Sequence, residues 1–149
     1  MLLFHPVLSN NIARGISDLR DKPMNKSGTL CPSRPIINHY LIEVFGLAKE
    51  TLSDAILLDA LVRKFASINR LQIVKDLQFE FEPTGLTLMY ILSASHLVAH
   101  TWPEVRYLHL DLMSCDHRST EGLEKELEVC AISVFGAQHV IVTAVVYAS

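Results

Sequence analysis

Residues 77–85 read Leu-Gln-Phe-Glu-Phe-Glu-Pro-Thr-Gly, and this stretch decides the fold class. Apolar and polar side chains alternate at every position up to residue 82, which is the pattern of a strand with one buried and one solvated face. The Pro-Thr-Gly sequence that follows is typical of a turn. Three further strand-like segments come next, at residues 86–92, 96–101 and 107–113. The sequence therefore predicts a meander of antiparallel strands.

Helices are predicted before and after this meander in the sequence. Residues 36–45 are a strand candidate, and Thr51-x-x-Asp54 then resembles a capping box that opens a helix. The apolar face of that helix is predicted to consist of Leu57, Leu61, Phe65 and Ile68. A second amphipathic helix carries Leu123, Leu127, Cys130 and Val134. It is expected to stop at Gly136, where a left-handed cap is easiest for glycine, and residues 139–148 complete the domain as a strand.

The resulting order, β-α-β-β-β-β-α-β, predicts an α+β fold. We expect a two-layer α/β sandwich in which an antiparallel sheet carries two helices on one face. The other sheet face is left uncovered, and we interpret it as a dimer surface. Half of the 149 residues are hydrophobic and the mean hydropathy is +0.28. Such a composition is high for a soluble monomer and favours a homo-oligomer.

Composition argues against several classes of partner. The net charge is −3 and the 13 Lys and Arg residues are scattered, so we expect no nucleic-acid partner. The longest apolar run, residues 140–148, is about half of what a membrane helix needs, so no membrane association is expected. Cys31, Cys115 and Cys130 show no C-x-x-C spacing, which argues against a disulfide framework and a zinc cluster. A cytoplasmic location fits this cysteine usage.

The first 34 residues differ from the rest of the chain. Five Arg or Lys residues stand against two Asp in residues 1–34, and no apolar period is sustained there. We interpret residues 1–34 as a flexible leader and residues 35–149 as one folded domain.

Reactive side chains are concentrated in residues 95–104, which read Ser-His-Leu-Val-Ala-His-Thr-Trp-Pro-Glu, and Cys115 follows Ser95 by twenty positions. A metal site is not favoured here, because His96 and His100 on one strand lie about 13 Å apart. Ser95 and His100 are five residues apart, so on a regular strand they point to opposite faces about 16 Å from each other. They cannot easily meet within one protomer.

This pattern resembles the small prokaryotic S-adenosylmethionine decarboxylase proenzymes, which depend on a pyruvoyl group. Their motif is Glu-Ser-His, three variable residues, then His-Thr-Trp-Pro-Glu, with a cysteine twenty residues after the serine. This chain has Ala94-Ser95-His96, then residues 100–104, then Cys115, and an upstream family pattern matches residues 81–87. The resemblance covers about residues 36–149.

The resemblance implies that the chain cuts itself between Ala94 and Ser95. Ser95 would attack the preceding carbonyl and end as a covalent pyruvoyl group, which forms a Schiff base with S-adenosylmethionine and accepts electrons as carbon dioxide leaves. His100 and Thr87 would assist the cleavage, and Cys115 would return a proton to the substrate. The resemblance also implies three substrate-binding residues. Phe81 would stack on adenine, Glu104 would hold the ribose hydroxyls, and Trp102 would line the same site. The active sites would be shared within a homodimer.

Departures from the family pattern leave two alternatives open. Ala94 replaces a glutamate, which suggests an unprocessed homologue that acts as a partner subunit. Leu88 replaces a glycine, and Arg106 and His109 replace small residues, which suggests a pyruvoyl-dependent decarboxylase of ornithine or arginine instead. Otherwise the expected product is decarboxylated S-adenosylmethionine for spermidine and other polyamines.

Overall fold

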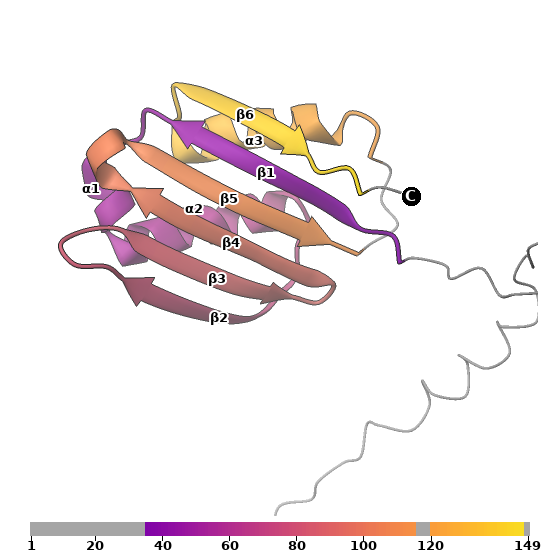
Figure 1. The fold of residues 1–149 in the computed structure, drawn as a ribbon, viewed down its shortest axis with the longest axis horizontal. Helices are drawn as coiled ribbons and strands as arrows, with labels where there is room; N and C mark the ends of the chain where they lie inside the picture. Colours follow the sequence, from indigo (N-terminus) through magenta and orange to yellow (C-terminus); the bar gives the residue numbers. More distant parts are fainter. Residues whose placement is uncertain (1–34, 116–119, 148–149) are drawn as a thin grey trace, which may run out of the picture. The chain divides into compact units, whose positions relative to one another are not determined.

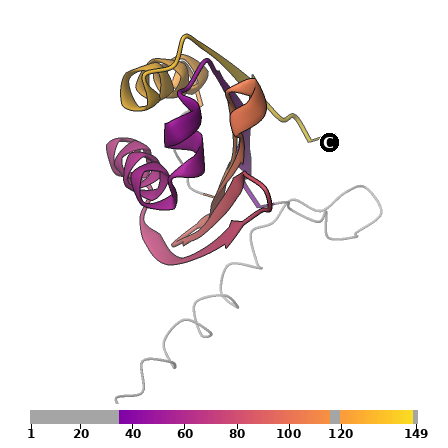
Figure 2. The same cartoon turned by 90° about the vertical axis from the view of Figure 1, so that its left-hand side faces the viewer.

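The computed structural model describes residues 35–115 and 120–147. The interpretation of residues 1–34 as a leader concerns residues outside this part. Among the described residues, one antiparallel sheet of six strands carries the helices on one face (Figures 1 and 2). The predicted α+β sandwich is confirmed.

The six strands are arranged in the order β2-β3-β4-β5-β1-β6. Their bounds are β1 Asn38–Phe45, β2 Ile73–Glu80, β3 Leu86–Leu92, β4 Ser95–Trp102, β5 Tyr107–Ser114 and β6 His139–Ala144. Strands β2 to β5 form the predicted meander, and β1 lies between β5 and β6. The last strand, β6, ends at Ala144, whereas the sequence predicted a strand that continues to residue 148.

Three α-helices lie on the same side of the sheet: α1 Lys49–Ser53, α2 Ala55–Ile68 and α3 Leu123–Phe135 (Figure 2). A single 3-10 turn, η2, spans Pro103–Val105. The predicted end of the second helix is confirmed, since Gly136 caps α3 in a left-handed conformation with φ 64°. The core lies between this helical layer and the inner face of the sheet.

The predicted start of the first long helix is wrong, and its predicted apolar face is right at Leu61 and Phe65 but wrong at the other two residues. Thr51 belongs to the separate helix α1, and Asp54 is the N-cap of α2, where its carboxylate accepts the backbone N–H groups of Ile56 and Leu57. Leu57 and Ile68 are exposed. The residues of α2 that are buried against the sheet are Leu58, Val62, Phe65 and Ala66.

We call the sheet face without helices the outer face. Strand β2 lies at the edge of the sheet, and its apolar residues Leu77 and Phe79 are 68% and 59% exposed in the single chain. Phe81, just after β2, is 51% exposed. The alternation in residues 77–82 predicted a buried face here, but no element of the described chain covers it. Met89 and Ile91 of β3 continue this apolar surface.

Candidate functional site

A cavity of about 340 Å³ opens where β3 begins and β4 ends. Five predicted site residues line it together: Phe81, Thr87, His100, Trp102 and Glu104. They come from the turn before β3, from β3, from β4 and from η2. Phe81 packs edge to face on Phe79, with 4.9 Å between ring centroids, so one ring of the cavity wall is held by a neighbour on the edge strand. We call this group of five residues the pocket end.

His100 and Thr87 meet because they are directly opposite each other in the β3–β4 register. The Thr87 hydroxyl lies 2.8 Å from Nδ1 of His100. Burial lowers the pKa of His100 below its ordinary value, the neighbouring charge of His109 lowers it further, and Asp111 acts in the opposite direction. A histidine with a lowered pKa is neutral at physiological pH and has a nitrogen available to accept a proton.

The cavity is also lined by two residues that the sequence did not identify as site residues, Thr101 and Gly85. The buried hydroxyl of Thr101 accepts the backbone N–H of Leu86 at 2.8 Å and donates to the carbonyl of Leu52 at 2.9 Å. Gly85 has φ 111°, and a Cβ there would lie 3.2 Å from the carbonyl oxygen of Thr101. Thr101 stands within the quoted motif, and Gly85 in the turn, so the residue types were visible although their contacts were not.

The predicted cleavage site lies in the tight turn between β3 and β4. Ser95 pairs with Leu92, so only Ser93 and Ala94 lie between the paired residues. Ser95 has φ 120°, a conformation that is costly for a residue with a side chain, by about 1–3 kcal/mol. The carbonyl oxygen of Ala94 accepts the backbone N–H of Cys115 at 3.0 Å. The peptide expected to break is therefore strained on one side and polarised on the other.

Ala94, Ser95 and Cys115, which we call the cleavage end, are separate from the pocket end within one chain. Ser95 begins β4, whereas His100 and Trp102 lie near its other end. Five residues of strand separate Ser95 from His100 by about 16 Å. The Ser95 hydroxyl lies 3.4 Å from Nδ1 of His96 and the Cys115 thiol is exposed. The predicted site residues thus fall into two separate groups within one chain.

Two substitutions that suggested a different substrate lie away from the cavity. The Leu88 side chain is 2% exposed within the core. The Arg106 guanidinium donates to the carbonyls of Gly46 and Leu47, where it fastens a turn. The third, His109, lies on the outer face, directly opposite His100 in the β4–β5 register. Only His109 is placed where it affects a predicted site residue.

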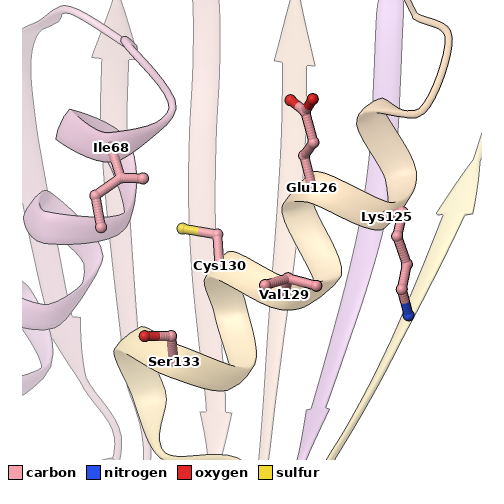
Figure 3. Close-up of a pocket in the computed structure, with 6 residues that line it drawn as sticks. All are labelled: Ile68, Lys125, Glu126, Val129, Cys130 and Ser133. Atoms are coloured by element: carbon pink, nitrogen blue, oxygen red, sulfur yellow. The ribbon is translucent and has the colours of Figure 1, made fainter.

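A second cavity, of about 470 Å³, lies between the C-terminal end of α2 and α3 (Figure 3). It is lined by Ile68, Lys125, Glu126, Val129, Cys130 and Ser133. The Cys130 thiol accepts a hydrogen bond from the Asn69 side chain at 3.3 Å, and burial raises its pKa. This thiol therefore stays protonated, as expected for the core residue that the sequence suggested.

Two features are absent from the described residues. Within residues 35–115 and 120–147, no three His, Cys, Asp or Glu side chains are grouped so that they could hold a metal ion. In the same part of the chain, no helix is both long and apolar enough to cross a membrane.

Comparison with known families gives a match over most of the chain. The profile of the family described as S-adenosylmethionine decarboxylase matches residues 38–146. A proenzyme of that name from Thermococcus onnurineus is 32% identical over 77 residues, which are 52% of this chain and 55% of the relative. The one from Moorella thermoacetica is 33% identical over 85 residues, 57% of this chain and 68% of the relative. The chain thus spans just over half the length of the Thermococcus relative that it matches.

A solved structure confirms the fold independently of close sequence similarity. The crystal structure of the adenosylmethionine decarboxylase from Aquifex aeolicus superimposes with a TM-score of 0.62, covers 78% of this chain and 98% of its own, and is 17% identical. At that identity the likeness concerns the arrangement of the sheet and helices.

Proposed function

Because this chain belongs to the S-adenosylmethionine decarboxylase family, we propose that it is a self-processing, pyruvoyl-dependent enzyme that decarboxylates S-adenosylmethionine. The product would be the aminopropyl donor for spermidine and other polyamines. The observation that carries the proposal is the state of the Ala94–Ser95 peptide. Its serine has a positive φ, and its carbonyl is hydrogen-bonded to the N–H of Cys115.

The first step of self-processing is an acyl shift from nitrogen to oxygen. The Ser95 hydroxyl attacks the carbonyl carbon of Ala94, the hydroxyl proton passes to the Ser95 nitrogen as the peptide C–N bond breaks, and an ester joins the two parts of the chain. Negative charge develops on the Ala94 oxygen during the attack, where the Cys115 N–H already points. Strain at Ser95 favours the step, because the broken peptide no longer restrains this residue.

The second step requires a base. Removal of the Cα proton of Ser95 lets the electron pair expel the Ala94 carboxylate from Cβ, and one water then converts the resulting enamine to a ketone and releases ammonia. His100 suits this role because its lowered pKa keeps the ring neutral. In this role Nδ1 carries the ring proton and donates it to the Thr87 hydroxyl oxygen, which leaves Nε2 free to take the Cα proton.

The pocket end supplies the substrate contacts. A cavity of about 340 Å³ is within the usual range for a site that holds a small molecule. Phe81 and Trp102 offer aromatic surface for an adenine ring, and the Glu104 carboxylate can accept hydrogen bonds from ribose hydroxyls. The pyruvoyl carbonyl that replaces Ser95 acts as the electron sink for the loss of carbon dioxide. We assign to Cys115, whose backbone N–H bonds the Ala94 carbonyl, the donation of a proton to the substrate carbon.

The complete site requires a second copy of the chain. Ser95 and His100 lie at opposite ends of one strand, and a strand cannot fold back on itself. We therefore propose a homodimer in which the outer faces meet and the cleavage end of one protomer faces the pocket end of its partner. The apolar side chains exposed on that face, among them Phe79, Met89 and Ile91, would be buried by such pairing.

Intact-mass measurement of the purified protein under denaturing conditions tests the proposal. We expect two fragments divided between Ala94 and Ser95, and a single chain for Ser95→Ala. Borohydride or a hydrazine reagent should label only the C-terminal fragment of the parent. An uncut parent chain that shows no such label would refute self-processing and would favour the unprocessed partner subunit instead.

Coexpression of two inactive variants tests whether the site is shared. A Ser95→Ala chain retains His100, and a His100→Ala chain retains Ser95. In a mixed dimer, the first chain should supply the base that cuts the second, so only the His100→Ala chain is cleaved. Cleavage of neither chain in the mixture, while the parent is cut, would show that both residues must come from one protomer.

The alternative decarboxylation of ornithine or arginine is less well supported. Leu88 and Arg106 do not reach the cavity, so two of the three substitutions that suggested it leave the binding surface unchanged. Assays of the processed protein on the three amino-acid substrates would decide. Turnover of a basic amino acid without turnover of S-adenosylmethionine would replace the leading proposal.

A further inference from the structure

We propose that Glu43, Tyr107 and His109 form a positioning unit that holds His100 ready to act as a base. The inference rests on the proposed function, because it assigns His100 that role. His109 lies directly opposite His100 on the outer face, and Tyr107 connects His109 to Glu43 by hydrogen bonds. None of the three belongs to the family motif of residues 94–104. We call the three residues the Glu43 unit.

The register of the sheet places these groups in one row. Glu43 of β1 is directly opposite His109 of β5, His109 is directly opposite His100 of β4, and His100 is directly opposite Thr87 of β3. Directly opposite side chains on one face of a sheet have Cβ atoms about 5 Å apart. Four polar residues therefore cross the outer face in a line that ends at the cavity.

Hydrogen bonds connect Glu43 and His109 of this row through the Tyr107 hydroxyl. The Tyr107 hydroxyl donates to Oε1 of Glu43 at 3.1 Å, and the hydroxyl oxygen of Tyr107 lies 3.1 Å from Nδ1 of His109. The hydroxyl has one proton, and the carboxylate takes it, so Nδ1 of His109 must be the donor to the tyrosine oxygen. This fixes the tautomer and orientation of the His109 ring. The His109 ring also contacts the Tyr107 ring, with 6.3 Å between the two ring centroids.

The charges that face His100 come from several strands. His109 and Asp111 lie on β5, with Tyr107 beside them, and His96 lies on β4 itself. Thr87, which is uncharged, faces His100 from β3. Burial lowers the pKa of His100 most, the electrostatic effect of His109 lowers it further, and Asp111 raises it. His109 thus favours the neutral His100 at the pH values at which an isolated histidine would start to gain a proton.

Nuclear magnetic resonance of the histidine rings tests the electrostatic part of the inference. In the uncut Ser95→Ala protein, His109→Gln should raise the pKa of His100, and Asp111→Asn should lower it further. His139→Gln is the matched control, since His139 lies on β6 at the far side of β1 and should leave His100 unchanged. Shifts of the same sign in the His109 and Asp111 variants, or none, would overturn the inference.

The tautomer tests the positioning part. With Glu43→Gln, the amide can donate to Tyr107, whose proton then turns toward His109 and displaces the proton from Nδ1. The nitrogen chemical shift of Nδ1 should change from the protonated toward the unprotonated range. An unaltered Nδ1 would contradict the proposed chain of donors, whereas a merely structural role for Glu43 predicts no such change.

Cleavage kinetics connect the unit with function. Precursor with Ser95 intact, made by cell-free translation and followed at pH 5.5 to 8.5, should be cut more slowly in His109→Gln than in the parent at the acid end, by about threefold or more. The two rates should converge above about pH 8, where His100 is neutral in both. An equal loss at every pH would mean that His109 only supports the fold, and would overturn the inference.

The two proposals fail separately. If the parent is not cut at all, self-processing is refuted, and the ring titrations alone then decide whether the Glu43 unit controls His100. If the parent is cut but His109→Gln changes neither the titration nor the pH profile, the Glu43 unit is refuted and the proposed function stands.

Discussion

Replacement of Thr101 by valine tests how the floor of the cavity is held. The two side chains have nearly the same shape, so Thr101→Val removes the hydroxyl and little else. That hydroxyl serves two backbone groups, the N–H of Leu86 and the carbonyl of Leu52. Both residues are buried, with exposed fractions of 3% and 0%, so water cannot replace the lost partner.

The structure sets the size of the expected effect. Each buried backbone group left without a partner costs about 1–3 kcal/mol. The additional methyl group returns about 0.8 kcal/mol through burial. The free energy of unfolding should therefore fall by roughly 3 kcal/mol, with bounds of about 1 and 5 kcal/mol.

Urea unfolding of the Ser95→Ala protein provides the assay, because the uncut chain unfolds as one molecule. Thr101→Ser is the matched control, since it keeps the hydroxyl and loses one methyl group, for a cost of about 1 kcal/mol. If valine and serine at residue 101 destabilise equally, the two hydrogen bonds contribute nothing net and the reasoning is wrong. A larger loss for valine confirms that the hydroxyl ties α1 to the start of β3.

Three further outcomes are expected. Asp54→Ala should lower the free energy of unfolding by about 1 kcal/mol in urea, since α2 loses its N-cap; no loss would show that the cap is dispensable. Burial and the nearby Glu43 raise the pKa of Tyr107 to about 12, so stability held below pH 10 should decline as the pH rises toward 12, and less so in Tyr107→Phe. Ile91→Glu should give monomers in analytical ultracentrifugation, with Lys64→Glu on the helical side as control, and unchanged dimers would place the interface elsewhere.

Local patterns in the sequence predicted the sheet well. Alternation with period two needs only neighbouring residues, and it identified all four strands of the meander to within two residues at either end, apart from the first half of β2. The helix face was harder to predict. In α2 the sets 57, 61, 65, 68 and 58, 62, 65, 66 both suit helical periodicity, and contact with the sheet selects the second. That contact is tertiary, so the sequence pattern did not reveal it.

The site residues divide in the same way. Motif spacing identified Thr87 and His100, but their contact depends on the register of β3 against β4, which the turn at Ser93 and Ala94 sets. The positive φ of Ser95 and the bond between Ala94 and Cys115 have no signal in residue types. The contact between Glu43 and Tyr107 has no sequence signal either, because it joins strands more than sixty residues apart.

The position of the cleavage end explains how maturation depends on assembly in the proposed enzyme. Ser95 is activated within its own protomer, by backbone strain and by the Cys115 N–H, so the acyl shift has its local requirements in a single chain. His100 lies about 16 Å along the same strand, so the elimination that follows needs the partner's ring. The acyl shift is reversible and the elimination is not. Pairing of two protomers therefore commits the chain, and an unpaired protomer returns to the intact peptide.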